Sequence, residues 1–467
     1  MATQHENYAP NVTVAKRVSV YPKTLMHPHR ILNLSNLDRQ CPLLMYLVFF
    51  YKASQAYNNL SLNPVFSSLK SGLEETLSIW YPAAGRLNLN PNDGKLNLWC
   101  NNEGAFLIEA VTQVKISELG DLSHYNEFFE NLIYKPFFNG NFSVMPLVVA
   151  QVTKFGCGGY SVGIGTSHSL FDGPATFEFL RAWACNSAIM KEKGSHELQK
   201  PVHERDMGNC HSQKSNTIMR AAAISHLYQL IQQTKTAADH HYHQNLAKDH
   251  GRLGDRNPNY LLKTFHLSGA MVENLKKKVL GERRNSSVSC SSFEVLTAHL
   301  WKARTKALGV TKERMVCLQF AVDTRNKMMP SLPKGFSGNA YVLASVLTRA
   351  GELEEGSHEA IIEKIKQAKN SVNSDYVNAY MEALDGPQAN LPPLDELTLV
   401  SDWTRMPFHK VDFLQGDAAY ASPLVAPIPQ AAYFMQNPMD FGGIDVRISL
   451  TPQALDSFSH YFLMNLL

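Results

Sequence analysis

The sequence predicts an α/β protein of two domains, and three observations lead to this. The chain has 467 residues, more than one hydrophobic core usually serves. From about residue 15 to residue 185, and again from residue 261, strand-like segments alternate with helix-like ones, which favours mixed α/β architecture. Between these halves the composition is mainly polar and holds eight of the 18 histidines, as is typical of a solvated linker.

We therefore expect an N-terminal domain at 1–190, a crossover linker at 191–255 and a C-terminal domain at 256–467. One helix near Asn216–Thr236 is expected to interrupt the linker. The run His240-His241-Tyr242-His243 could be taken for a metal cluster, but it lacks cysteines or paired carboxylates at ligand spacing. The sequence therefore predicts no metal site.

Composition narrows the class of protein. A hydrophobic share of 44% and a charged share of 18% describe an ordinary globular chain, and a net charge of +3 leaves no basic footprint for nucleic acid or membrane. Seven scattered cysteines without Cys-x-x-Cys spacing suggest neither zinc nor a disulfide framework. The N-terminus is polar, and the longest apolar run, Pro42–Tyr51, is too short to cross a bilayer. We expect a cytoplasmic protein.

The first half predicts strands and one long helix in a definite order. Leu43–Phe50 is apolar and aromatic, and Leu60–Trp80 follows with leucines four residues apart, the spacing of a helix. Further strands are expected at Lys95–Trp99, Phe106–Val111 and Pro146–Thr153. A glycine-rich hairpin signal, Lys154–Gly159, joins the last of these to the next strand.

A histidine follows that next strand. Gly159–Gly165 alternates like a strand with one packed face, and His168 comes three residues later. Asp172 then precedes Gly173 and Pro174, which predicts a helix start with a capping carboxylate and a proline in the first turn. Functional groups tend to lie at such junctions. In a chain with 18 histidines, however, a His-x-x-x-Asp pair also arises by chance, and a buried structural histidine would look the same.

The second half repeats the α/β pattern. Ser291-Ser292-Phe293-Glu294 predicts a capping box that starts a helix running through Trp301. Met315–Val322 and Tyr341–Val346 are predicted strands. The glycine-rich stretch Gly335–Ala340 between them is not a phosphate-binding Walker loop, because no Lys-Ser/Thr follows its glycines.

Several of these segments together resemble the plant BAHD acyltransferase family, whose markers run in order through nearly the whole chain. They are Leu34–Asp38, Tyr81–Leu87, Cys100–Gly104, His168 with Asp172, Ser292–Glu294 with Ala298–Trp301, Val322–Arg325 and Gly335–Asn339. Within the family the resemblance is to the DEFECTIVE IN CUTICULAR RIDGES branch. That likeness lies in Val20–Leu25, Gly338–Ser345 and Ser401–His409.

The resemblance implies a fold and a reaction. The fold would be two similar-sized domains of the chloramphenicol acetyltransferase type, with mixed sheets and a solvent channel between them. An acyl-CoA co-substrate and a hydroxylated acceptor would enter this channel, with no permanently bound cofactor. The branch implies a hydroxy fatty acyl acceptor used for cutin or related surface polyesters. Family members are usually monomeric, so we expect a monomer.

The resemblance also assigns roles to residues. His168 would be the general base in a ternary complex, without a covalent enzyme intermediate. Asp172 could orient the imidazole or hold the loop, and the resemblance favours the loop, with Arg325 as ion-pair partner. Ser401 and Trp403 would lie near the developing oxyanion or simply pack. The residues expected along the channel are Gly173, Ser292, Trp301, Gly338, Asn339, Ser401 and Trp403.

Two places compete for the family's second motif, Asp-Phe-Gly-Trp-Gly. Asp440–Gly443 keeps more of its letters but lies just before the final predicted strand, Asp445–Leu450. Asp412–Gly416 follows the Trp403–Pro407 run, as in the family, and we choose it. Asp412 and Gly416 would then support the fold, and Leu414 with Gln415 would stand where the family has Gly and Trp. These two replacements put the affinity for the acyl-CoA donor or the shape of the loop in doubt more than the acyl-transfer step.

A different class of function remains open. Some BAHD-like proteins assist fatty-acid elongation as partners without acyl transfer of their own, and the altered motif could mark such a loss. The intact His168 and Asp172 argue for catalysis.

Overall fold

The computed structural model describes residues 12–25, 28–53, 61–187, 198–205, 221–238, 260–280, 290–384, 394–414, 416–424 and 428–464. The chain forms two compact units. Unit 1 is made of Met1–Met207, Pro333–Asn339 and Met406–Val425; unit 2 is made of Gly208–Leu332, Ala340–Arg405 and Ala426–Leu467. Each unit contains a mixed β-sheet with helices packed on it, which confirms the predicted α/β fold of two units. The solvent channel expected between them stays a prediction.

The two units are not the contiguous domains that composition suggested. The segments 333–339 and 406–425 come from the second half of the chain but fold with unit 1. The helix expected in the linker is α4 (Ala222–Ala238), and it packs in unit 2. There the Gln319 side-chain amide donates to the Ala223 carbonyl at 2.9 Å. The predicted His240–His243 cluster lies outside the described residues, and those residues contain no group of three metal-ligating side chains.

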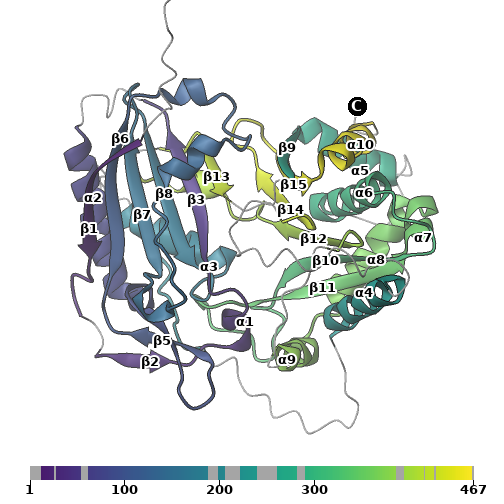
Figure 1. The fold of residues 1–467 in the computed structure, drawn as a ribbon, viewed down its shortest axis with the longest axis horizontal. Helices are drawn as coiled ribbons and strands as arrows, with labels where there is room; N and C mark the ends of the chain where they lie inside the picture. The colour runs from purple at the N-terminus through teal and green to yellow at the C-terminus, as the bar shows by residue number, and fades with distance from the viewer. Residues whose placement is uncertain are drawn as a thin grey trace, which may run out of the picture. The chain divides into compact units, whose positions relative to one another are not determined.

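The main sheet of unit 1 has the order β1-β6-β7-β8-β3-β13 (Figure 1). Its β6 and β7 are parallel, and the other neighbours are antiparallel. The strands are β1 (Val12–Val20), β3 (Leu44–Tyr51), β6 (Ala105–Thr112), β7 (Val148–Lys154), β8 (Tyr160–Ser167) and β13 (Tyr420–Leu424). A small antiparallel sheet adds β2 (Arg30–Leu32), β5 (Leu96–Cys100) and β4 (Arg86–Leu89). The predicted strands of the first half are therefore confirmed as β3, β5, β6, β7 and β8.

Alternation along β3 explains how both faces of this sheet are covered. The Phe50 ring packs on Phe129 at 4.8 Å, within the short helices that cover one face. The Phe49 ring meets Phe413 at 5.8 Å on the other face. Beside Phe413 lies Trp183 of α3, at 4.9 Å. The helices of unit 1 are α1 (Asn36–Arg39), α2 (Leu62–Ile79), α3 (Gly173–Asn186), η1 (Tyr81–Ala84), η2 (Ile116–Leu119), η3 (Glu127–Leu132), η4 (Phe142–Val144) and η5 (Phe408–Lys410).

The edge strand β13 reaches unit 1 from far along the chain. It pairs antiparallel with β3, so that Tyr420 lies opposite Phe50 and Leu424 opposite Tyr46. The pairing is extended by a hydrogen bond of 2.7 Å from the Ala419 backbone N–H to the Phe50 carbonyl. Unit 1 therefore completes its sheet with a segment of the C-terminal half.

The sheet of unit 2 has the order β11-β10-β12-β14-β15-β9, with β12 parallel to both of its neighbours. Its strands are β9 (Leu261–Leu267), β10 (Met315–Asp323), β11 (Tyr341–Arg349), β12 (Leu397–Asp402), β14 (Ala431–Gln436) and β15 (Ile444–Leu450). The remaining helices are α5 (Gly269–Leu280), α6 (Ser292–Ala307), α7 (Ala350–Glu355), α8 (His358–Asn370), α9 (Ser374–Ala383) and α10 (Pro452–Leu463). The three strands predicted in this half are confirmed as β10, β11 and β15.

Helices cover both faces of this sheet as well. Gln319 on β10 bonds α4, whereas the next residue, Phe320, meets Phe293 of α6 with ring centroids 5.4 Å apart. The predicted capping box of α6 is confirmed. The Ser291 hydroxyl accepts from the Glu294 N–H at 3.2 Å, and the Glu294 carboxylate accepts from the Ser291 N–H at 2.9 Å.

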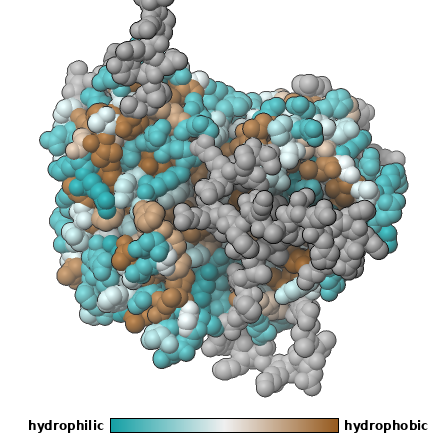
Figure 2. All heavy atoms as spheres, in the orientation of Figure 1, coloured by the Kyte–Doolittle hydropathy of each residue, from teal (hydrophilic) through white to brown (hydrophobic). Residues whose placement is uncertain are grey.

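Where Figure 2 colours the surface by hydropathy, hydrophilic residues are widespread and hydrophobic residues appear in scattered patches. Within the part of the chain that the structure describes, no helix combines the length and the apolar character needed to span a membrane.

Candidate active site

His168 lies one residue past the end of β8, in the turn that leads to α3. Its side chain is half-buried, and its backbone N–H donates to the Leu43 carbonyl at 2.9 Å. The carbonyl of the preceding residue, Ser167, accepts from the Leu170 N–H at 3.0 Å, which closes the turn. The sequence therefore places a half-buried histidine on a hydrogen-bonded turn between a strand and a helix.

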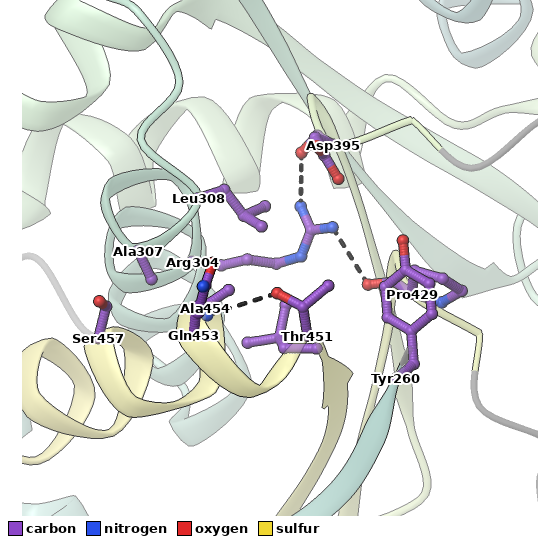
Figure 3. A pocket seen from close by; sticks show the side chains of 11 residues that line it. Tyr260, Arg304, Ala307, Leu308, Asp395, Pro429, Thr451, Gln453, Ala454 and Ser457 are labelled. Atoms are coloured by element: carbon purple, nitrogen blue, oxygen red, sulfur yellow. Dashed lines mark hydrogen bonds between the residues drawn. The ribbon is translucent and has the colours of Figure 1, made fainter. Parts of the chain in front are cut away.

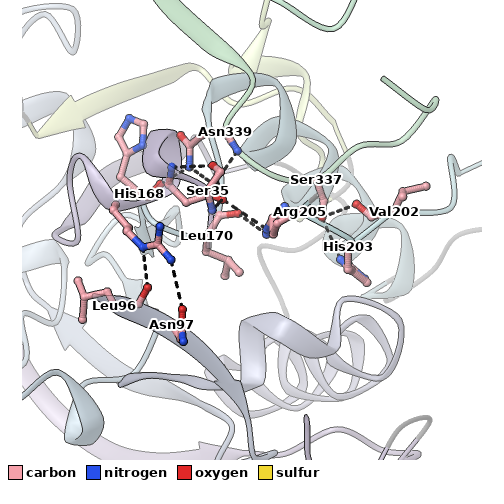
Figure 4. Close-up of polar contacts among 12 residues, drawn as sticks. Ser35, Leu96, Asn97, His168, Leu170, Val202, His203, Arg205, Ser337 and Asn339 are labelled. Carbon is pink, nitrogen blue, oxygen red and sulfur yellow. Dashed lines mark hydrogen bonds and ion pairs between the residues drawn. The ribbon is translucent and has the colours of Figure 1, made fainter. Parts of the chain in front are cut away.

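The carbonyl oxygens of this turn are held by two buried side chains of unit 1 (Figure 4). The side-chain amide of Asn339 donates to the His168 carbonyl at 2.7 Å. The guanidinium of Arg205 donates to the Leu170 carbonyl at 3.0 Å. Both side chains also approach the carboxylate of Asp38, which is completely buried. Asn339 was predicted as a channel residue, but it is 0% exposed and contacts the turn from beneath.

A second set of contacts fixes Arg205 itself. The Ser337 hydroxyl lies 3.5 Å from the Arg205 guanidinium and 2.9 Å from Nδ1 of His203. Gly338 leaves the room that the guanidinium needs, because a Cβ atom there would lie 2.3 Å from Arg205 Nη1. Gly338 was also predicted to line the channel; it is buried against this arginine instead. Arg205 lies in the polar stretch that we assigned to the linker. The composition of that stretch therefore did not predict that Arg205 packs in unit 1.

Asp172 caps α3, as predicted. Its carboxylate accepts from the Ala175 backbone N–H at 3.0 Å, and its side chain is buried. The next residue, Gly173, lies where a Cβ atom would meet the Met406 sulfur at 2.6 Å. Arg325 belongs to unit 2, where its guanidinium pairs with the Asp323 carboxylate at 3.2 Å. The ion pair between Asp172 and Arg325 stays a prediction.

Comparison with known proteins then decides the family. Residues 10–464 match the family model described as "Transferase family". The chain belongs to this family. It is 52% identical to the brassinosteroid-related acyltransferase 1 of Arabidopsis thaliana, over 97% of this chain and 98% of that protein. It is 30% identical to the omega-hydroxypalmitate O-feruloyl transferase of the same plant, over 92% of this chain and 88% of the relative.

The fold agrees with that of a solved structure. The crystal structure of vinorine synthase superposes with a TM-score of 0.71 at 19% identity, over 97% of this chain and 98% of that one. The resemblance to the BAHD acyltransferases is thereby confirmed, and the protein is an acyltransferase that takes an acyl-CoA as its co-substrate.

In unit 2 of the acyltransferase, Ser401 and Trp403 form a pair at the end of β12. The indole N–H of Trp403 donates to the Ser401 hydroxyl oxygen at 2.9 Å, and both side chains are half-buried. This bond orients the hydroxyl, which is what an oxyanion donor requires. Their part in catalysis stays a prediction.

The two other predicted channel residues of unit 2 lie on α6. Ser292 is half-buried in its first turn. Trp301 is completely buried, so it packs in the helix–sheet core and does not line an open channel.

The segment chosen for the second family motif folds into unit 1. Phe413 and Leu414 are buried, and the Asp412 carboxylate accepts from the Gly416 N–H at 2.7 Å. Gly416 has φ +125°, a backbone conformation that other residues rarely adopt. These contacts fit the supporting role expected of Asp412 and Gly416. Gln415 lies outside the described residues.

Unit 2 also contains a pocket of about 290 Å³ beside the start of α10 (Figure 3). Its wall includes Arg304, which is 1% exposed and donates to the carbonyls of Asp395 at 2.8 Å and Pro429 at 3.1 Å. Burial lowers the pKa of Arg304 to about 10. Because these bonds tie two loops to α6, the arginine is structural, and none of the predicted site residues lines this pocket.

Proposed function

We propose that this acyltransferase moves an acyl group from a CoA thioester to a hydroxyl group, with His168 as the general base. In this reaction the imidazole takes the hydroxyl proton as the oxygen attacks the thioester carbonyl. A C–O bond forms, the C–S bond breaks, and the departing thiolate takes the proton from the imidazolium. Base catalysis of this type typically contributes a factor of about 10² to 10⁴.

The observation that supports this proposal is the setting of His168. The residue is half-buried, while its N–H, its carbonyl and the carbonyl of Leu170 are all bound by other parts of unit 1. The contrast with a structural histidine lies in burial. His203 is only 5% exposed, with Nδ1 on Ser337 and Nε2 on the Ile79 carbonyl, whereas His168 is half-buried at the end of a strand.

We propose that Ser401 assists by donating to the oxyanion that develops on the thioester oxygen. Its hydroxyl already accepts from the Trp403 indole, so its own proton is directed elsewhere. Removing one donor of this kind usually costs a factor of about 10² to 10³ in rate.

For the acceptor we propose a hydroxyl on a large hydrophobic molecule, with a hydroxylated steroid as the first candidate. The relative with 52% identity is named for brassinosteroids and matches nearly the full length. A hydroxy fatty acyl compound, as in cutin, is the second candidate, because the relative with 30% identity is named for omega-hydroxypalmitate. Both acceptors combine an apolar body with one reactive hydroxyl.

The test uses purified wild-type protein, His168→Ala and His124→Ala. His124 is a matched control, since it is a surface histidine of unit 1 with 55% side-chain exposure. Each protein receives acetyl-CoA, a long-chain acyl-CoA and feruloyl-CoA, with a hydroxylated steroid or an ω-hydroxy fatty acid. We expect ester and free CoA in equal amounts from wild type and His124→Ala, and a loss of about 10²-fold or more in His168→Ala.

Equal product from folded wild type and folded His168→Ala would contradict the general-base role. Wild-type protein that is folded yet inert with every donor and acceptor would favour the other candidate, a partner protein that assists fatty-acid elongation without its own acyl transfer.

A further inference from the structure

The carboxylate of Asp38 is completely buried and contacts the side chains that hold the turn at Ser167–Leu170, called the catalytic turn below. Asp38 accepts from the Ser35 N–H at 3.0 Å and from the Ser35 hydroxyl at 2.8 Å through one oxygen. Its other oxygen accepts from the Asn339 N–H and the Asn339 side-chain amide, both at 2.9 Å. The guanidinium of Arg205 approaches to 3.8 Å. A buried charge is costly unless it is paired and hydrogen-bonded, and this one is.

We propose that Asp38 is a positioning residue for the general base, acting on His168 through Asn339 and on Leu170 through Arg205. The inference rests on the proposed function of His168. It assigns to Asp38 and Asn339 the orienting role that was one of the two alternatives for Asp172, whose carboxylate caps α3.

The geometry shows how the backbone sets the direction of the imidazole. The His168 N–H is bound by Leu43, and the His168 carbonyl by Asn339. With both neighbouring peptide groups held, the Cα–Cβ bond of His168 has a fixed direction, and the position of the imidazole then depends on two side-chain torsions. A displacement of about 1 Å at a reacting group can cost on the order of 10²-fold in rate.

The charge on Asp38 decides which way the Asn339 amide points. A carboxylate can only accept, so it requires the NH₂ group of Asn339 on its side. The same NH₂ group then supplies its second proton to the His168 carbonyl at 2.7 Å. Both oxygens of Asp38 also accept from backbone N–H groups, those of Ser35 and Asn339. With Asn at position 38, one of these acceptors becomes an NH₂ group that faces a backbone N–H. The side chain must then move, which weakens its hold on Asn339 and, through Asn339, on the His168 carbonyl.

Arg205 holds a second carbonyl of the turn. Its guanidinium donates to the Leu170 carbonyl, and it fits against residue 338 because that residue is glycine. Asp38 thus joins two donors that bind carbonyls on either side of Ser169. Asp38, Arg205 and Asn339 all belong to unit 1.

The experiment compares Asp38→Asn and Asn339→Ala with Gln151→Ala. Gln151 is the matched control: it is 3% exposed, lies in unit 1, and its amide donates to the Asn131 carbonyl at 2.9 Å, away from the catalytic turn. The measurements are kcat and KM for acyl-CoA and acceptor, with circular dichroism and urea unfolding to verify the fold. We expect kcat to fall about 10- to 100-fold in Asp38→Asn and Asn339→Ala, with KM changed by less than about threefold.

Gln151→Ala should lose comparable stability and keep kcat within about threefold of wild type. The proposal is overturned if folded Asn339→Ala and Asp38→Asn keep kcat at the level of Gln151→Ala. If Asn339→Ala does not fold, the isosteric Asp38→Asn decides alone, and failure of both to fold also contradicts a positioning role. His168→Ala is assayed in parallel. Full activity there defeats the proposed function, whereas an inactive His168→Ala beside active Asp38→Asn and Asn339→Ala defeats only this inference.

Discussion

The hydroxyl of Tyr51 donates a hydrogen bond of 2.6 Å to the carbonyl of Val411, which lies 360 residues further along the chain. Tyr51 ends β3, and Val411 leads into the segment that we chose for the second family motif. The bond therefore attaches that segment to the central sheet of unit 1. It is one of the contacts through which the C-terminal half contributes to the unit that carries His168.

Tyr51→Phe should destabilise unit 1 by about 1–3 kcal/mol, because it leaves the buried Val411 carbonyl without its donor. Urea unfolding followed by circular dichroism measures this free energy. Tyr228→Phe is the control, since Tyr228 is 56% exposed, and it should unfold within about 0.5 kcal/mol of wild type. Equal midpoints for Tyr51→Phe and Tyr228→Phe would show that the bond contributes nothing measurable.

Substitutions at Asp172 should separate its two structural roles. Asp172→Ala removes the cap of α3 and should cost about 0.5–2 kcal/mol, whereas Asp172→Asn can still accept from the Ala175 N–H and should cost much less. Thermal unfolding of both variants gives the comparison. If Asp172→Asn is as damaging as Asp172→Ala, the charge matters beyond the cap, and a double-mutant cycle with Arg325→Gln then tests the predicted ion pair.

Adding a methyl group should be harmful at Gly338 and mild at Gly173. At Gly338 the new Cβ would meet the Arg205 guanidinium, which is held by the Leu170 carbonyl, so we expect a cost of about 1–3 kcal/mol and reduced kcat. At Gly173 the neighbour is the thioether end of Met406, a flexible side chain that can move aside. Unfolding and kinetics of Gly338→Ala and Gly173→Ala test this order, and a larger loss in Gly173→Ala would reverse it.

Unit 2 should lose stability in mild acid because of a histidine pair. Nδ1 of His299 lies 3.3 Å from Nε2 of His358. Burial, followed by the charges of His299 and Lys302, lowers the pKa of His358 from 6.5 to about 4. Above pH 6.5 His358 is neutral in both the folded and the unfolded chain, so its titration does not affect the free energy of unfolding. Below pH 6.5 His358 binds a proton in the unfolded chain but not in the folded chain. The free energy of unfolding therefore falls as the pH drops from about 6.5 to about 4.

Urea unfolding at a series of pH values measures that slope. His358→Asn should flatten it between pH 6.5 and pH 4, and His29→Asn, which removes an exposed histidine, should leave it unchanged. An identical slope in wild type and His358→Asn would rule out the pair as its source.

Local features of the fold were predictable because their causes are local. The strand before His168 follows from alternation, and the starts of α3 and α6 follow from capping chemistry within four residues. The strand β13 was missed, since it has five residues including Pro423 and shows no clear alternation.

The support beneath His168 was harder to predict because its contacts join distant parts of the chain. Asp38 and Asn339 are 301 residues apart, and nothing in either segment identifies the other as its partner. The family resemblance placed both residues in family motifs but assigned Asn339 to a channel. Only the fold shows that its side-chain amide binds the His168 carbonyl.

The strand β13 has a consequence for how the protein is made. During synthesis the N-terminal sheet emerges from the ribosome first, yet its edge partner is encoded at Tyr420–Leu424. Until those residues appear, the backbone donors and acceptors of β3 remain open to any other extended chain. The sheet of the first half therefore keeps one unpaired edge until the last tenth of the chain has been synthesised. A premature stop before residue 420 would leave that nascent edge permanently available for misassembly.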